Sequence, residues 1–72
     1  MSEFNTLNEK VSNLPINAGT GTRALVINNT SNIASGTDSI AEGADTQATE
    51  NYAHAEGYAT IASGQGSHVE GN

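Results

Sequence analysis

Two histidines, each followed two residues later by a glutamate, are the residues of this sequence best suited to chemistry. His54 and Glu56 form one pair, and His68 and Glu70 form the other, fourteen positions further along. Residues two apart in an extended strand share a face, so the imidazole and carboxylate of each pair lie side by side. Zinc and related ions accept such nitrogen and oxygen ligands, so one interpretation is a metal site built across chains.

An electrostatic ladder is the simpler interpretation of the same residues. Glu42, Glu56 and Glu70 recur at that interval, so a chain that stacks with this period places their carboxylates above one another. Histidines beside such a column offset the repulsion between like charges. We favour the ladder, and the sequence predicts no bound metal, no cofactor and no catalytic residue.

Other motifs that suggest chemistry lack an essential part. No serine, histidine and aspartate are carried on the separate elements that a catalytic triad requires. The GTGT run at 19–22 lacks the Lys-Ser/Thr ending of a phosphate loop. Asp38 and Asp45 are typical of turns, because the period here is seven rather than the nine of calcium-binding rolls.

The His–Glu pairs belong to a seven-residue repeat that runs from Asn32 to Asn72. Each copy of the repeat is called a line, and the six lines are numbered from Asn32. A small apolar residue occupies its third place, at Ala34, Ala41, Ala48, Ala55, Ala62 and Val69. Glycine follows two places later, at Gly36, Gly43, Gly57, Gly64 and Gly71. Glu50 replaces this glycine in the third line, so we expect an irregular turn at Asn51–Tyr52.

Each line predicts a strand of about five residues and a turn of about two. Places one, three and five carry mostly small residues, with Asn32 and Glu50 grouped among them, and are predicted to face inward, while places two and four face outward. Along the outward places, Ser35, Thr49 and Ser63 alternate with the glutamates Glu42, Glu56 and Glu70. This alternation predicts a fourteen-residue coil, with odd lines in one parallel sheet and even lines in another.

Two segments carry apolar side chains that we expect other chains to cover. The coil places Ile33, Ile40 and Ile61 on its outside, where another chain must cover them. At the N-terminus, Phe4, Leu7, Val11 and Leu14 have the spacing of a coiled-coil stripe that Pro15 ends. A fibre-like homotrimer meets both demands, although two heptads do not distinguish a dimer from a trimer.

These patterns divide the chain into three parts. We predict a coiled-coil helix over 1–14, a neck linker over 15–24 and the repeat array over 25–72. The apolar run 24–27 is interpreted as the first strand of the array, with Ile27 at the alanine place and Asn29 at the glycine place. A terminal repeat is expected to be atypical.

Composition narrows the function further. The 72 residues include no cysteine, one phenylalanine and two tyrosines, so a lone chain has little with which to build a core. A net charge of −6 disfavours nucleic acid and anionic membrane as partners. Neither a membrane-spanning run nor a secretory signal is visible, so we expect assembly in the cytoplasm.

The lines SIAEG, AHAEG and SHVEG, alternating with IASG, resemble the head repeats of trimeric autotransporter adhesins. Their spelling is closer still to repeats of phage and prophage tail fibres and spikes. The resemblance covers about 32–72. It implies a mainly β, left-handed parallel β-roll of three chains, a structural or adhesive role and no enzymatic chemistry.

We therefore expect a non-catalytic structural component of a phage or phage-like tail fibre, located in the virion and joined to other virion proteins through its N-terminus. Ile33 and Ile61 are expected at the trimer interface with the N-terminal stripe, because ionised glutamate is costly in a dry interface. The other option places His54 and Glu56 at the axis. Alternative functions are an adhesin head that binds a host-surface ligand from the bacterial cell surface, and an ice-binding roll.

Overall fold

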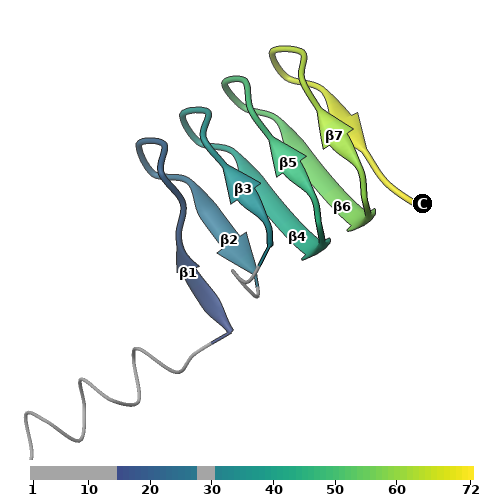
Figure 1. Ribbon diagram of the computed structural model, residues 1–72. Helices are drawn as coiled ribbons and strands as arrows, with labels where there is room; N and C mark the ends of the chain where they lie inside the picture. The colour runs from purple at the N-terminus through teal and green to yellow at the C-terminus, as the bar shows by residue number, and fades with distance from the viewer. Residues whose placement is uncertain (1–14, 28–30) are drawn as a thin grey trace, which may run out of the picture.

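The computed structural model describes residues 15–27 and 31–72, which form a β-solenoid of about three turns (Figure 1). The strands are β1 (Ile16–Ala18), β2 (Leu25–Ile27), β3 (Ile33–Ala34), β4 (Ile40–Ala44), β5 (Gln47–Ala48), β6 (His54–Tyr58), β7 (Ile61–Ala62) and β8 (His68–Val69). Within these two ranges the chain is mainly β and contains no helix. The predicted helix at 1–14 lies outside the described residues.

The strands form two sheets, and from β2 onward successive strands alternate between them. One sheet has the order β1-β2-β4-β6-β8 and the other has the order β3-β5-β7. All neighbours pair in parallel except β1 and β2, which are antiparallel. The predicted separation of odd and even lines into two parallel sheets is therefore confirmed.

The register shows where the repeat is regular and where it is not. Ile33 lies opposite Gln47, and Gln47 lies opposite Ile61. Between β2 and β4 the offset is one residue longer, so Val26 lies opposite Ala41. The prediction that Ile27 takes the alanine place is therefore wrong, because the chain holds one extra residue between these two strands.

Alanine fills the space between the sheets. The alanines at the third place are at most 1% exposed, and Ala53 joins them. Val26 and the half-buried Val69 are the larger apolar side chains that pack with them. Among side chains that are less than 2% exposed the largest are Thr46 and Ser39, so the space between the two backbones mostly admits small side chains.

Buried polar side chains bond to the backbone or to each other. Ser39 donates to the Gly36 carbonyl at 2.7 Å, and the Thr46 hydroxyl donates to the Asn32 side-chain oxygen at 2.8 Å. Asn32 also donates to the carbonyl of Gly43 at 2.9 Å. Within the described residues, no buried side-chain nitrogen or oxygen lacks a partner, which removes the main cost of burying polar groups.

The fifth place departs from the predicted inward face. Gly36 is buried there, whereas Gly43, Gly57, Gly64 and Gly71 are exposed. In the even lines the backbone of this glycine has φ between 107° and 112°, which bends the chain out of strand alternation. The odd lines show no such φ, and this explains why Glu50 is tolerated.

The turns share one conformation. The second residue of each turn is left-handed, at Asp38, Asp45, Tyr52, Ala59 and Gly66. The turn at Asn51–Tyr52 is bonded as its neighbours are, with the Tyr52 amide donating to the Thr37 carbonyl at 2.8 Å. The expected irregularity at this turn is therefore wrong.

The segment predicted as a neck linker contains strand β1. Its residues Ile16, Asn17 and Ala18 pair with β2 and extend the larger sheet. The sequence does not predict this strand, because three residues are too few to show alternation. The turn that follows holds Arg23 in a left-handed conformation and leads directly into β2.

Arg23 forms a two-pronged ion pair with Asp38 of the next coil. Its Nε and Nη2 donate to the two carboxylate oxygens at 2.7 and 3.0 Å. The hydrogen bond from Arg23 holds the pKa of Asp38 below its ordinary value, and the guanidinium charge adds to this, while desolvation opposes it. The pair is exposed to solvent, so it links two turns without contributing much stability.

Gly43→Ala should destabilise the fold by at least about 2 kcal/mol. The backbone φ of +112° is unfavourable for alanine, and the new methyl carbon would lie 2.0 Å from the Gly57 carbonyl oxygen. Gly64→Ala is the matched control, because its nearest neighbour would be the Ser67 side chain at 3.6 Å. Urea unfolding followed by circular dichroism measures both variants, and equal stability would contradict the assigned backbone geometry.

The carboxyl group of Asp38 should titrate nearer its ordinary range in Arg23→Gln. A depressed pKa in the folded state means that the pair stabilises the fold at neutral pH and that this contribution is lost as the pH falls below about 4. Carbon-13 NMR of the carboxyl group measures the titration. Arg23→Lys keeps the charge without the fork and should give an intermediate value, whereas an unchanged titration in Arg23→Gln would exclude the ion pair.

Candidate functional site

Strands β4, β6 and β8 bring the two predicted His–Glu pairs into one column on the outside of the larger sheet. The register places His54 opposite His68 and Glu42 opposite Glu56. Ile40 precedes the histidines in their row, so the row changes from apolar to polar along the stack. The period of the repeat therefore determines which side chains meet.

Each histidine nitrogen lies between glutamates of two successive coils. Nε2 of His54 is 3.0 Å from Oε1 of Glu42 and 3.8 Å from Oε2 of Glu56. Nε2 of His68 is 3.1 Å from Oε1 of Glu56 and 4.0 Å from Oε2 of Glu70. Glu56 thus contacts both histidines, one with each carboxylate oxygen.

The two imidazole rings are stacked. Their centroids are 4.7 Å apart and their planes differ by 1°. This distance equals the usual spacing of hydrogen-bonded strands, so the side chains repeat the geometry of the backbone beneath them. The predicted column of stacked histidines and glutamates is present.

Two neighbours in the column lower the pKa of Glu42. Hydrogen bonding with the Glu56 carboxyl group, followed by the bond from His54, holds the pKa of Glu42 below its ordinary value, while desolvation opposes this. An ionised Glu42 can only accept, so Nε2 of His54 carries the proton in this bond. The positive edge of the ring therefore faces a row of negative charge.

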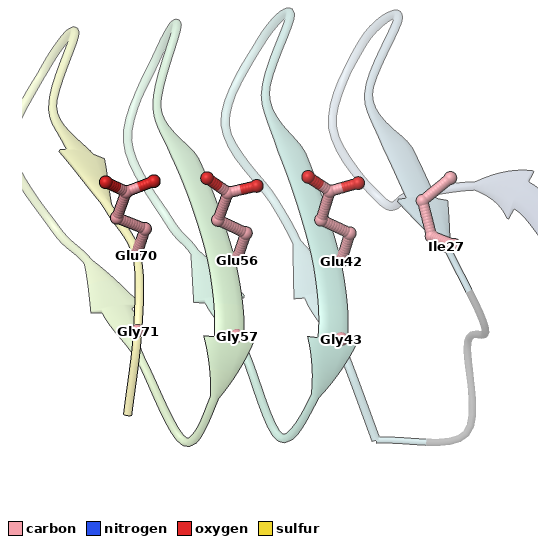
Figure 2. Close-up of a pocket in the computed structure, with 7 residues that line it drawn as sticks. All are labelled: Ile27, Glu42, Gly43, Glu56, Gly57, Glu70 and Gly71. Atoms are coloured by element: carbon pink, nitrogen blue, oxygen red, sulfur yellow. The ribbon is translucent and has the colours of Figure 1, made fainter.

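A groove runs beside the column. It is lined by Ile27, by the three glutamates and by Gly43, Gly57 and Gly71. Figure 2 shows the three glutamate side chains in one line with their carboxylates on the same side, above the row of glycines. Because the glycines carry no side chain, one flank of the carboxylate row stays open to solvent.

This arrangement is suited to binding cations rather than to nucleophilic chemistry. In both imidazoles Nε2 bonds a carboxylate, so that nitrogen is not free to take a proton from a hydroxyl group. Ligand atoms of His54, Glu56 and His68 all lie within 4.8 Å of one another. The expectation that the chain is not an enzyme stays a prediction.

The other predicted site residues lie elsewhere. Ile33 and Ile61 are 46% and 55% exposed on the outer face of the smaller sheet. Gln47 of β5 lies between them in the same row. The N-terminal stripe of Phe4, Leu7, Val11 and Leu14 is outside the described part of the chain.

Sequence reasoning missed two residues that bind across coils. Asn32 was grouped with the small inward residues, yet its side chain bonds the carbonyls of Ile27 and Gly43 and the amide of Thr46. The sequence feature that could have indicated this role is an amide side chain at a place that small side chains hold in the other lines. Arg23 could have been matched to Asp38 only with the fifteen-residue offset in hand.

Comparison with family models, with curated proteins and with solved structures found no match for this chain. Across residues 15–27 and 31–72, the structure holds no helix of the length and apolarity required to cross a membrane.

His54 and Glu42 should be coupled by about 0.5 kcal/mol in a double-mutant cycle with His54→Gln and Glu42→Gln. The value is small because each side chain is about one-third exposed. Urea unfolding at one fixed protein concentration measures it. Glu50→Gln is the matched control, since Glu50 lies outside the larger sheet and should combine additively with His54→Gln. Additivity of the first pair would contradict the ladder.

Proposed function

We propose that the chain is a non-catalytic structural segment of a homotrimeric tail fibre or spike of a phage or phage-like particle. In this proposal the repeating unit is a fourteen-residue coil of a left-handed parallel β-roll. The pairing of Ile33 with Gln47 and of Ile40 with His54 supports that coil length. The resemblance of the repeat to fibre and adhesin heads supports the hand and the number of chains.

The main observation behind the proposal is that small side chains fill the interior while larger apolar side chains lie on the outside. Alanines fill the interior, whereas Ile33 and Ile61 lie about half exposed on the outside. Burying an isoleucine side chain fully contributes about 1.5–3 kcal/mol, so covering the exposed half of each contributes about 1 kcal/mol. A small domain that leaves this energy unused is better stabilised by association.

Charge favours the smaller sheet as the face that meets the other chains. Its outer residues are uncharged, namely Ile33, Ser35, Gln47, Thr49, Ile61 and Ser63. The larger sheet carries the glutamate column, and ionised carboxylates are costly to enclose in a dry interface. We therefore place β3, β5 and β7 toward the threefold axis and the His–Glu column toward solvent.

The remaining parts of the proposal concern the ends and the location. Residues 1–14 would align the three chains as a short coiled coil and join other tail or virion proteins. The segment would assemble in the host cytoplasm and act in the virion. Neither nucleic acid nor membrane is a partner in this proposal, in keeping with the acidic net charge of −6.

Native mass spectrometry of the full chain at micromolar concentration should show a trimer. Substituting both exposed isoleucines, Ile33→Ser and Ile61→Ser, should raise the concentration for half dissociation at least about tenfold, because about 2 kcal/mol per chain is lost. Ile16→Ser is the control, since Ile16 is 51% exposed but lies on β1 of the larger sheet. The proposal would be wrong if the chain were a folded monomer. It would also be wrong if Ile16→Ser raised the dissociation concentration as much as the double variant does.

A further inference from the structure

The His–Glu column repeats one constellation in successive coils. We call each constellation a rung, made of one histidine and the two glutamates that flank its Nε2. The first rung is His54 with Glu42 and Glu56, and the second is His68 with Glu56 and Glu70. Their nitrogen-to-oxygen distances agree within 0.2 Å, at 3.0 and 3.8 Å in the first rung and 3.1 and 4.0 Å in the second. All the ligand atoms come from one chain, so the site does not depend on the oligomeric state.

We propose that each rung binds one divalent transition-metal ion, such as Zn²⁺, through the histidine Nε2 and one oxygen from each glutamate. Ligands about 2.0–2.1 Å from a tetrahedral zinc ion are about 3.3 Å apart. The observed distances of 3.0 and 3.8 Å in the first rung bracket that separation. For the ion to bind, the proton on Nε2 of His54 leaves that nitrogen and the ring stays neutral with its proton on Nδ1, while water completes the coordination of the ion.

Glu56 joins the two rungs. Its Oε2 faces His54 and its Oε1 faces His68, so a single carboxylate bridges two ions stacked along the solenoid. Bridging also relieves the column of the repulsion among three carboxylates, because each ion adds two positive charges between them. The ligands are held in place by the parallel pairing of β4, β6 and β8, which spaces the rungs by one strand.

A single ion shared by both histidines does not fit the geometry, although the ligand atoms of His54, Glu56 and His68 lie within 4.8 Å. Imidazole binds a metal along the lone pair in its own ring plane. The two rings are parallel to within 1° and 4.7 Å apart, so their lone pairs do not converge on one point. Two nitrogens bound to one ion must also be nearer than about 4.2 Å.

The types of ligand determine which metals bind, and the exposure of the ligands determines which rung binds more tightly. An imidazole with carboxylates suits zinc, copper or nickel, whereas calcium and magnesium prefer oxygen alone. His54 and Glu56 are about one-third exposed, while the side chains of His68 and Glu70 are 52% and 71% exposed. The first rung is therefore the tighter site, because its ligands lose less freedom on binding.

Isothermal titration of the full chain with Zn²⁺ should give two ions per chain, with the first binding more tightly. Co²⁺ should give visible absorption bands of a nitrogen- and oxygen-bound ion that Zn²⁺ removes. His54→Gln should leave one ion of the weaker class, His68→Gln should leave one of the tighter class, and the double variant should bind none. Glu56→Gln should weaken both sites at least about tenfold, since it removes a ligand of each.

Glu50→Gln is the matched control for charge, because it removes the same negative charge from outside the larger sheet and should leave both sites intact. Circular dichroism of each variant establishes that it folds. One ion per chain lost equally in His54→Gln and His68→Gln would overturn the assignment of one ion to each rung. Zn²⁺ binding that persists in the double histidine variant, or that Ca²⁺ matches, would overturn the metal site altogether.

Discussion

The close approach of two sheets is the constraint on which the rest of this structure depends. Side chains no larger than threonine are fully buried, and alanine occupies most of the interior. So thin a layer contributes little hydrophobic energy of its own. The hydrogen bonds between parallel strands and between stacked turns therefore maintain the fold. Bulky side chains are thereby excluded to the outside, where they become surfaces available for contact.

Much of this architecture could be predicted from the sequence, because the repeat determines which residues alternate. The alanine places, the two sheets and the column of His54, Glu56 and His68 all follow from the seven-residue spacing. The repeat did not predict backbone conformation. The glycines at the fifth place look equivalent in sequence, yet Gly43 and Gly57 have positive φ and the fifth-place residues of the odd lines do not. That distinction makes Glu50 compatible with a regular turn.

The features that could not be predicted lie where the repeat begins. Strand β1 is too short to show a pattern, and the offset between β2 and β4 is one residue longer than elsewhere. This single residue moved Val26 into the alanine column and brought Arg23 beside Asp38. The pairing of Asn32 with Thr46 depends on the geometry of the bend and has no counterpart in the later lines. Irregular contacts of this kind need coordinates, because no spacing rule specifies them.

Each strand stacks only on the coils before and after it, and this has a mechanical consequence. In such an array, stability is close to a sum over repeats and the interfaces between neighbours. Loss of a coil at either end breaks one such interface, whereas loss of a central coil breaks two, so the ends of the stack should open first. A chain pulled from the end of β8 would release its coils in sequence, each yielding a similar length, so the solenoid would extend stepwise under load. This gradual failure distinguishes it from a compact domain that gives way at once.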